Sequence, residues 1–474
     1  MSALAAALAS ALLSSCGTPL SPGYTVLKEA REVQFVAGAP PSLHIQSTYT
    51  LLNSGTSELN FIDVTFPIAS EYGRADARAE LDGHPTPLDP LPAEYQFDSP
   101  NDLRVSFAVP WKQGERNDLL IEYWFRAPFQ PGIGLTLGPG DFHLGSRGAF
   151  AVLEPPKHLF APFPKRPAKM DYVVRVPADF RVLARGSLVG HKKDGNDVEY
   201  RFRLAAKDLT PFVVAGRYAE STPNGEAGPI VWSFQPLSID AAEANEIGQS
   251  WDTLDKDFGP LDKNIHAPHI VEATDLPEHI GQEQGFAAAA FPGGALVSPT
   301  ALSQAAQSEE FVEAVSHALA HNWLGDQIFA APDATIGLGE GLPEYAMIAI
   351  DEDRGGEAAR KKRIQRYLAA YDKALREANE QTLAVARITD PAPQRRIALD
   401  KAPLFFAAIE DQVGSDTMKS ALKDMVTLFR GQQVDYNVLR SELEQKSGKN
   451  LAPTFRLWLN ERAIPEEFRA RYGG

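Results

Sequence analysis

Residues 308–350 read SEEFVEAVSHALAHNWLGDQIFAAPDATIGLGEGLPEYAMIAI, and they include two histidines, His317 and His321, four positions apart. Apolar side chains recur around this pair at helical spacing, and Ser308 followed by two glutamates is typical of a capped, acidic first turn. On a helix, residues i and i+4 project from the same face. Two imidazoles placed in this way can bind one zinc ion together, although a histidine pair on an apolar helix can also be purely structural.

A possible third ligand follows at a fixed distance. Eighteen residues separate His321 from Glu340, which opens a second segment with helical character. This spacing, together with the local sequences HNWLGD and LGEGLPEYA, resembles the aminopeptidase N and leukotriene hydrolase family of gluzincin peptidases. The resemblance implies that His317, His321 and Glu340 bind a zinc cofactor.

Two positions depart from the family pattern. Ala318 stands where the family has the glutamate that takes a proton from the zinc-bound water, and such a base contributes about 10²–10⁴-fold in rate. In the segment IALDKAPLFF, aligning Lys401 with the family's lysine puts Leu399 where a tyrosine donates to the oxyanion, a contact whose loss costs about 10²–10³-fold. An alignment slip at Leu399 stays open because that motif is short. The resemblance therefore implies a zinc site whose catalytic groups are missing.

Substrate-binding candidates lie in the Gly/Ala-rich stretch GQEQGFAAAAFPGGALVSPTAL. Aligned without a gap, the family's amine-binding glutamate falls on Gln284, whereas a slip of one residue recruits Glu283. Glutamine keeps a hydrogen-bond acceptor but lacks the charge that strengthens a contact with an ammonium group. The same stretch is equally consistent with a packing loop that glycine permits.

The N-terminal segment predicts export and lipid anchoring. Residues 3–13 form an apolar run too short to span a bilayer, and the only cysteine of the chain, Cys16, follows in the sequence LSSC. This resembles a bacterial lipobox, which implies lipid on Cys16 and a protein held at the cell envelope, with outer-membrane sorting allowed by Gly17. Because no Lys or Arg precedes Cys16, an ordinary signal peptide or a start further upstream stays open.

Changes in pattern along the 474 residues predict two domains behind this anchor. After a signal segment over 1–16 and a linker over 17–24, short alternating segments broken by Pro, Gly, Asn and Asp predict an antiparallel β-sandwich over 25–220. Helical patterns prevail over 225–474, where the resemblance implies a thermolysin-like domain. The expected fold class is α+β. The basic cluster at 360–363 is expected on the solvated face of a helix.

Net charge and hydropathy bear on whether the protein binds nucleic acid or spans a membrane. The net charge of −16 argues against nucleic-acid binding, which needs a basic face, and the sequence leaves the oligomeric state open. No run after Cys16 has the length of a membrane span, so membrane contact is expected through the lipid alone. We expect a zinc-binding, aminopeptidase-like protein with impaired or absent catalysis that binds peptides or a protein partner. The main alternative is an active zinc peptidase in which Glu283 or Glu344 acts as the base; a structural envelope protein without metal is the third.

Overall fold

The computed structural model describes residues 23–65, 76–90, 102–126, 135–145, 150, 152–154, 167–205, 211–225, 228–236, 239–261, 267–274, 276, 288–304, 308–387 and 390–473. The chain forms two compact units, and each is described on its own. The first unit comprises residues 1–130, 147–178 and 186–206, and the second comprises 131–146, 179–185 and 207–474. Together they confirm the expected α+β class, with strands predominating in the first unit and helices in the second.

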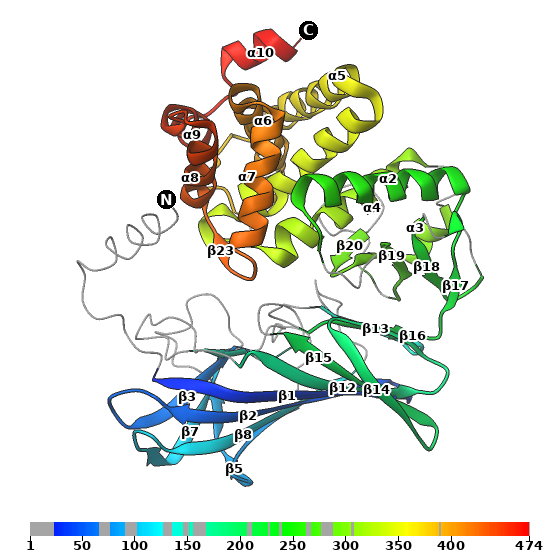
Figure 1. Ribbon diagram of the computed structural model, residues 1–474, viewed down its shortest axis with the longest axis vertical. Coiled ribbons are helices and arrows are strands. Elements are labelled where there is room, and N and C mark those ends of the chain that lie inside the picture. Colours follow the sequence, from blue (N-terminus) through cyan, green and yellow to red (C-terminus); the bar gives the residue numbers. More distant parts are fainter. Residues whose placement is uncertain are drawn as a thin grey trace. The chain divides into compact units, whose positions relative to one another are not determined.

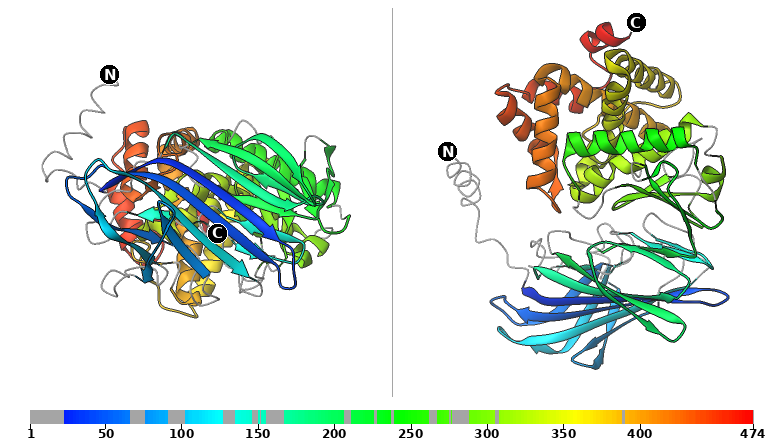
Figure 2. Two further views of the ribbon diagram at one scale, coloured as in Figure 1. Left: turned by 90° about the horizontal axis from the view of Figure 1, so that it is seen from below. Right: turned by 45° about the vertical axis from the view of Figure 1, so that its right-hand side comes forward.

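The first unit contains an eight-stranded sheet and a four-stranded sheet (Figure 1). The long strands of the larger sheet run side by side through its middle (Figure 2). In spatial order the larger sheet consists of β14 (Ser187–Asp194), β15 (Asp197–Ala205), β12 (Lys169–Pro177), β1 (Tyr24–Val36), β2 (Ser42–Asn53), β8 (Arg116–Arg126), β4 (Asp76–Leu81) and β5 (His84–Thr86). The smaller sheet consists of β11 (Val152–Glu154), β3 (Leu59–Thr65), β7 (Asp102–Trp111) and β6 (Leu88–Pro90).

Alternating burial explains why these segments form strands. Every second side chain of β2, from Leu43 to Asn53, is buried, as expected when one face of a strand packs on a core. A tight turn joins β14 and β15, and Gly195 adopts a φ of +63° there, which glycine allows without strain. One pairing differs from the expected antiparallel sandwich, because β1 and β12 are parallel. A parallel pair cannot be joined by a hairpin, so the chain from Val36 to Lys169 makes the long connection.

Two sheets of four or more strands belong to the second unit. One contains β13 (Arg181–Ala184), β16 (Val213–Gly216), β10 (Asp141–Leu144) and β9 (Leu135–Leu137). The other contains β17 (Ala219–Ser221), β18 (Ile230–Ser233), β19 (His269–Glu272), β21 (Gly294–Val297) and β20 (Ala288–Phe291). The compact units therefore interleave along the chain. The reason is strand pairing, since β13 pairs with β16 and draws residues 181–184 into the second unit.

Helices account for most of the rest of the second unit. In Figure 1, α2 (Ala241–Phe258) and α4 (Glu309–Ala320) lie along the same face of the five-stranded sheet. The other helical segments are α3 (Pro299–Gln304), η6 (Asn322–Gln327), η7 (Pro332–Ala334), η8 (Thr335–Glu340), α5 (Gly341–Ala374), α6 (Ala392–Val413), α7 (Ser415–Leu428), α8 (Tyr436–Ser447), α9 (Ala452–Asn460) and α10 (Glu466–Tyr472). Two short strands, β22 (Phe329–Ala330) and β23 (Gln433–Val434), pair in parallel. Among the described helices, none combines the length and apolar character that crossing a membrane requires.

Helix α4 forms as its sequence predicts. The hydroxyl oxygen of Ser308 accepts a hydrogen bond of 3.2 Å from the backbone N–H of Phe311, which caps the first turn. Phe311, Val315 and Leu319 are fully buried, and burying each such side chain stabilises the fold by roughly 1.5–3 kcal/mol. With this stripe fixed on the core, His317 is held on the partly exposed side of the helix.

Candidate metal centre

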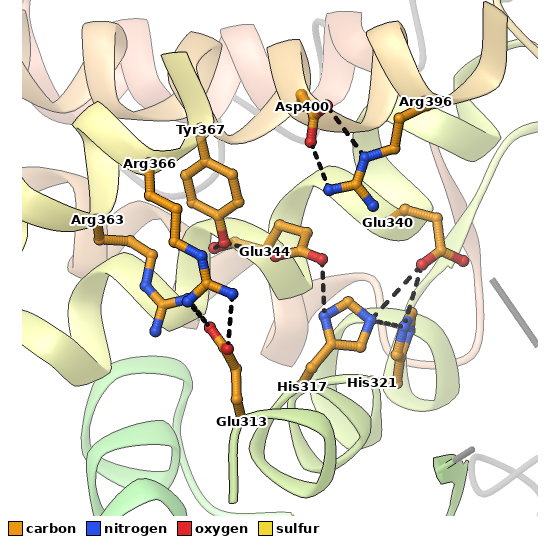
Figure 3. A network of polar contacts seen from close by, with 10 residues as sticks. All are labelled: Glu313, His317, His321, Glu340, Glu344, Arg363, Arg366, Tyr367, Arg396 and Asp400. Carbon is orange, nitrogen blue, oxygen red and sulfur yellow. Dashed lines mark hydrogen bonds and ion pairs between the residues drawn. The ribbon is translucent and has the colours of Figure 1, made fainter. Parts of the chain in front are cut away.

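Three side chains from two helical segments converge on one point. His317 and His321 come from the C-terminal end of α4, and Glu340 ends η8 immediately before α5 (Figure 3). The Nε2 atoms of the two histidines lie 3.1 Å apart. Glu340 Oε2 lies 3.4 Å from His321 Nε2 and 3.7 Å from His317 Nε2. The structure thus brings together the three residues that the sequence spacing selects.

These separations fit a zinc ion. Two ligands that each lie about 2.0–2.1 Å from zinc in tetrahedral geometry are about 3.3 Å apart from one another. The three observed separations, 3.1, 3.4 and 3.7 Å, lie around this value. Two imidazole nitrogens and one carboxylate oxygen are also a donor set found in catalytic zinc sites. It is the only group of at least three His, Cys, Asp or Glu side chains with metal-binding geometry within the described ranges.

The charges around the three side chains favour the ionised form of the Glu340 carboxylate beside the two imidazoles. Burial alone would raise the pKa of Glu340, but His321 and His317 outweigh burial and hold that pKa well below its ordinary value. Burial alone would lower the pKa of His317, but Glu344 and Glu340 outweigh it and raise that pKa. Glu340 is therefore ionised, and its charge lies beside the Nε2 atoms of the two histidines.

The end of α4 is anchored by the residues that follow the histidines. The side-chain oxygen of Asn322 accepts a hydrogen bond of 2.5 Å from the backbone N–H of Gly293, in the turn between β20 and β21. Trp323 is fully buried and donates its indole N–H to the backbone oxygen of Gly259 at 2.5 Å. At Gly325 a Cβ atom would lie 3.2 Å from His321 Nδ1, so glycine leaves room for that ring. These contacts fix the direction in which His321 projects.

Glu340 is positioned by close packing between α5 and α6. A Cβ atom on Gly341 would lie 2.5 Å from the Cβ of Ala402, a distance that no side chain tolerates without movement of one helix. Glycine after Glu340 therefore lets the start of α5 approach α6 closely. Sequence reasoning used this Glu-Gly pair only as part of the family resemblance, whereas the structure gives its steric reason.

Glu344 approaches the site from the far side of His317. Its Oε1 lies 3.4 Å from Nδ1 of His317, and its Oε2 accepts a hydrogen bond of 2.5 Å from the hydroxyl of Tyr367 (Figure 3). Burial, reinforced by the negative charge of Glu344, raises the pKa of Tyr367 well above its ordinary value, so the phenol keeps its proton. The i+4 spacing from Glu340 places Glu344 on the same helix face and could have indicated its proximity. Nothing in the local sequence indicates Tyr367.

The two positions that depart from the family pattern carry apolar side chains. Ala318 lies on α4 with 2% of its surface exposed, among the apolar side chains of the core. Leu399 lies on α6, half-buried against the same core. Lys401, which guided the alignment there, is fully buried and donates to Glu380 and to the backbone oxygen of Glu461, each at 2.8 Å. Its role is to join α6 to the C-terminal part of the chain.

Beside Leu399, α6 carries a charged pair close to the candidate site (Figure 3). Arg396 donates from Nε to Asp400 Oδ2 at 3.1 Å, and its Nη2 lies 2.9 Å from Oδ1. Burial raises the pKa of Asp400 to about 6, against the opposing effect of Arg396 and with a further increase from Glu344. Sequence reasoning missed this pair. An Arg and an Asp at i and i+4 on a helix were the available signal.

Two of the four residues in the basic cluster expected on a solvated face are internal, so the expectation is wrong for these two, whereas the other two are exposed. Arg360 is buried and donates to Glu410 at 2.9 Å and to the hydroxyl of Tyr472 at 2.6 Å. Arg363 contacts Glu313 of α4 and donates to Asp351 at 2.7 Å. Buried arginines of this kind are stable because carboxylates pair with them, and those partners come from distant positions in the sequence.

The remaining predicted site residues cannot be placed. Gln284 and Glu283, the candidates for binding a substrate amine, lie outside the described residues, and so does Cys16.

Comparison with known proteins agrees with this geometry. Residues 288–458 match the peptidase family M1 domain. No curated protein sequence matches the chain at a significant level.

Solved structures share the fold. The M1 zinc metallopeptidase from Deinococcus radiodurans is 18% identical, with a TM-score of 0.60 over 94% of this chain and 95% of that one. A mutant of the same enzyme bound to a Tyr-Ser-Ala substrate gives 19% identity and a TM-score of 0.61 over 94% and 95% of the two chains. Yeast LTA4 hydrolase is 12% identical, with a TM-score of 0.64 over 95% of this chain and 71% of that one.

The matched segment contains all three candidate ligands, and the metal named for the Deinococcus radiodurans structures, zinc, is the cofactor expected for the family. Residues 288–458 therefore match the peptidase family M1 domain, and the resemblance of the chain to the aminopeptidase N and leukotriene hydrolase family is confirmed.

Proposed function

We propose that this protein is a zinc-binding, aminopeptidase-like homologue with impaired or absent peptidase activity, which binds peptides or a protein partner at the cell envelope. One contrast carries the proposal. The ligand atoms of His317, His321 and Glu340 lie within 4.8 Å of one another, whereas the neighbouring position that needs a proton acceptor holds the methyl group of Ala318.

The chemistry of each position supports this reading. A bound zinc ion would supply a Lewis acid that polarises a peptide carbonyl and lowers the pKa of water. His317, His321 and Glu340 would hold the metal. Ala318 cannot accept a proton, and Leu399 cannot donate a hydrogen bond to an oxyanion. A peptide can therefore be bound and polarised, while the proton transfers that complete its hydrolysis lack their usual groups.

The alternative is an active peptidase that uses a different base, and Glu344 is the described candidate. Its carboxylate faces Nδ1 of His317, whereas the predicted ligands converge on Nε2 at the opposite corner of the ring. One of its oxygens also accepts from Tyr367. A general base must reach the proton that it removes within about 2.6–3.2 Å or through one water. The placement of Glu344 behind the ring therefore favours impaired catalysis over this alternative.

Peptide binding is supported by the relatives and by the sheet. A mutant of the Deinococcus radiodurans enzyme was crystallised with a Tyr-Ser-Ala substrate. Structures of a mutant two-domain M1 zinc metallopeptidase hold L-arginine or L-tryptophan. In this chain, β20 is an edge strand of the five-stranded sheet, and α4 packs against it. An extended peptide can add to the edge of such a sheet through main-chain hydrogen bonds.

The test of this function measures metal and turnover on the same samples. We expect the zinc-repleted, dialysed protein to retain about one zinc per chain and to hydrolyse a panel of aminoacyl fluorogenic amides only slowly. Replacing His317 and His321 with alanine together should abolish zinc retention. Full zinc content in that double variant would refute the site. Rapid, chelator-sensitive hydrolysis by the unmodified protein would instead establish the active alternative.

Anchoring is a separate part of the proposal and rests on the sequence around Cys16. In a bacterial host the exported protein should partition with membranes, be released by detergent and carry lipid on Cys16. The variant Cys16→Ser should be released in soluble form or retain its signal segment. Equal membrane fractions for the two proteins would exclude lipid as the cause of localisation.

A further inference from the structure

The candidate metal ligand His317 is backed by two further polar residues. Its Nδ1 lies 3.4 Å from Oε1 of Glu344. This nitrogen makes no hydrogen bond within the described part of the chain, so the carboxylate of Glu344 is the acceptor that faces it. The other oxygen of Glu344 accepts from Tyr367, so the carboxylate is held between a phenol and an imidazole. Figure 3 shows Glu344 between Tyr367 and His317, on the side of the ring away from Glu340.

The contact between Glu344 and Tyr367 depends on a reversal within α5. The two residues are 23 positions apart in one continuous helical segment, and a straight helix would separate them by about 35 Å at 1.5 Å per residue. Gly356 interrupts the segment with φ +67° and ψ −163°, a conformation that is essentially restricted to glycine. The chain therefore folds back at Gly356, and the second half of α5 returns to the metal-ligand end of the first half.

A second set of contacts holds the returning half against α4. Glu313, one turn before His317, accepts two hydrogen bonds from Arg366, at 2.8 and 2.9 Å, and also contacts Arg363. Arg363 is tied to Asp351 on the first half of α5. Tyr367 follows Arg366 directly in the sequence. Its hydroxyl therefore reaches Glu344 from a helical segment that ion pairs hold against both α4 and the first half of α5.

We propose that Glu344 and Tyr367 are positioning residues for the metal ligand His317, with Tyr367 holding the carboxylate that fixes the imidazole. This rests on the proposed function, because it assumes that the site binds zinc. A metal-binding histidine commonly donates its second ring N–H to a carboxylate, which fixes the tautomer and the orientation of the ring. Glu344 supplies that carboxylate. The hydroxyl of Tyr367 donates to its Oε2, which orients the carboxylate so that Oε1 faces Nδ1 of His317.

The experiment measures metal affinity and metal geometry in the full-length protein. Zinc affinity is determined by competition with a chromophoric chelator, and coordination geometry by the visible absorption of the cobalt(II)-substituted protein. We expect Glu344→Ala to weaken zinc binding by about 10–100-fold and to alter the cobalt spectrum. Tyr367→Phe removes one hydroxyl only, so we expect a smaller loss in the same direction. Glu344→Gln, which keeps an acceptor oxygen, should lie between the unmodified protein and Glu344→Ala.

The matched control is Glu357→Gln, an exposed position on the same helix, which should leave affinity and spectrum unchanged. Unchanged zinc affinity and cobalt spectra in both Glu344→Ala and Tyr367→Phe would overturn the inference. So would variants that lose only thermal stability of the metal-free protein, because that result indicates a structural role. If the unmodified protein binds no zinc, the proposed function fails and this inference fails with it. If Glu344→Ala does not fold, the result with Tyr367→Phe decides.

Discussion

Two regions of the second unit differ in the chemistry that their side chains offer. The metal-holding region, made of His317, His321 and Glu340, has three converging ligand atoms and a supporting carboxylate behind one ring. The proton-handling region, made of positions 318 and 399, has an alanine and a leucine that pack against the apolar core. Under the proposed function, holding a metal and moving protons are therefore separable properties of this fold.

The separation has a simple physical basis. A metal site depends on the mutual distances of its ligands, which the packing of α4, α5 and η8 maintains whether or not a reaction occurs. A general base depends on a single side chain, and alanine at a buried helical position costs the fold little. The proton-handling region can therefore be lost while the metal-holding region persists.

The largest expected effect comes from returning a base to the proton-handling region. Ala318→Glu should raise kcat/KM for aminoacyl amides by about 10²–10⁴-fold over Ala318→Gln, which has the same size but no ionisable group. Adding Leu399→Tyr should increase the rate further only in combination with Ala318→Glu, because both groups act on one transition state. Equal rates for the Glu and Gln variants with zinc bound would show that the two regions no longer share a working geometry.

Removing a ligand tests the metal-holding region directly. His321→Ala should weaken zinc binding by more than about 100-fold, because disturbing a residue behind a ligand already costs 10–100-fold. The control is His191→Ala, an exposed histidine on β14 in the first unit, which should leave affinity unchanged. Chelator competition gives both constants. An equal affinity for the two variants would place the metal elsewhere.

The charged pair beside Leu399 predicts a pH effect on stability. Burial raises the pKa of Asp400 from its ordinary value of 3.8 to about 6, against the opposing effect of Arg396. The folded state therefore binds the proton more tightly than the unfolded state, and this stabilisation is complete below pH 4 and is lost as the pH rises through 6. The loss amounts to about 3 kcal/mol, since each pKa unit corresponds to about 1.4 kcal/mol.

Asp400→Asn should abolish this dependence. Urea unfolding of the metal-free proteins at pH 4, 5, 6 and 7 should show the variant gaining stability relative to the unmodified protein as the pH rises, by up to about 3 kcal/mol. A difference in free energy of unfolding that stays constant across this range would contradict the assigned titration.

The smallest expected effect concerns the reversal that supports the metal-holding region. Gly356→Asn should cost about 1–3 kcal/mol in free energy of unfolding, because its φ and ψ exclude other residues. Gly448→Asn makes the same replacement at the end of α8, at φ 68° and ψ 11°, where asparagine is tolerated and the cost should be below about 1 kcal/mol. Chemical denaturation compares them. Equal costs would mean that the reversal at Gly356 adapts without strain.

Local sequence was sufficient for most of the elements, and the three candidate ligands came from the resemblance to a known family. Residues close together in the sequence determine the alternating burial in β2 and the cap and apolar stripe of α4. The spacing from His321 to Glu340 is likewise visible in one short stretch of sequence. The α+β class follows from the same local patterns. Each of these features depends on neighbours in the chain, which is why sequence reasoning reached them.

What sequence reasoning did not reach depends on contacts between distant residues. Arg360 was expected at the surface because it lies in a charged amphipathic segment, but Glu410 on α6 pairs with it in the interior. Tyr367 joins the candidate site only because the chain reverses at Gly356. Strand β1 was not identified as a separate strand, since its buried positions include the ion pair between Glu29 and Arg31 in place of a continuous apolar face.

The parallel pairing of β1 with β12 has a consequence for how the chain acquires its structure. Val33 pairs with Val174, so one edge of β1 keeps unpaired backbone groups until more than a hundred further residues have emerged. At about 5–20 residues per second, synthesis of that interval lasts roughly 7–30 s. An open strand edge is a template for association with other chains during that time. Folding of the first unit is therefore slow for topological reasons, and nascent chains need protection until residue 177 is available to close the sheet.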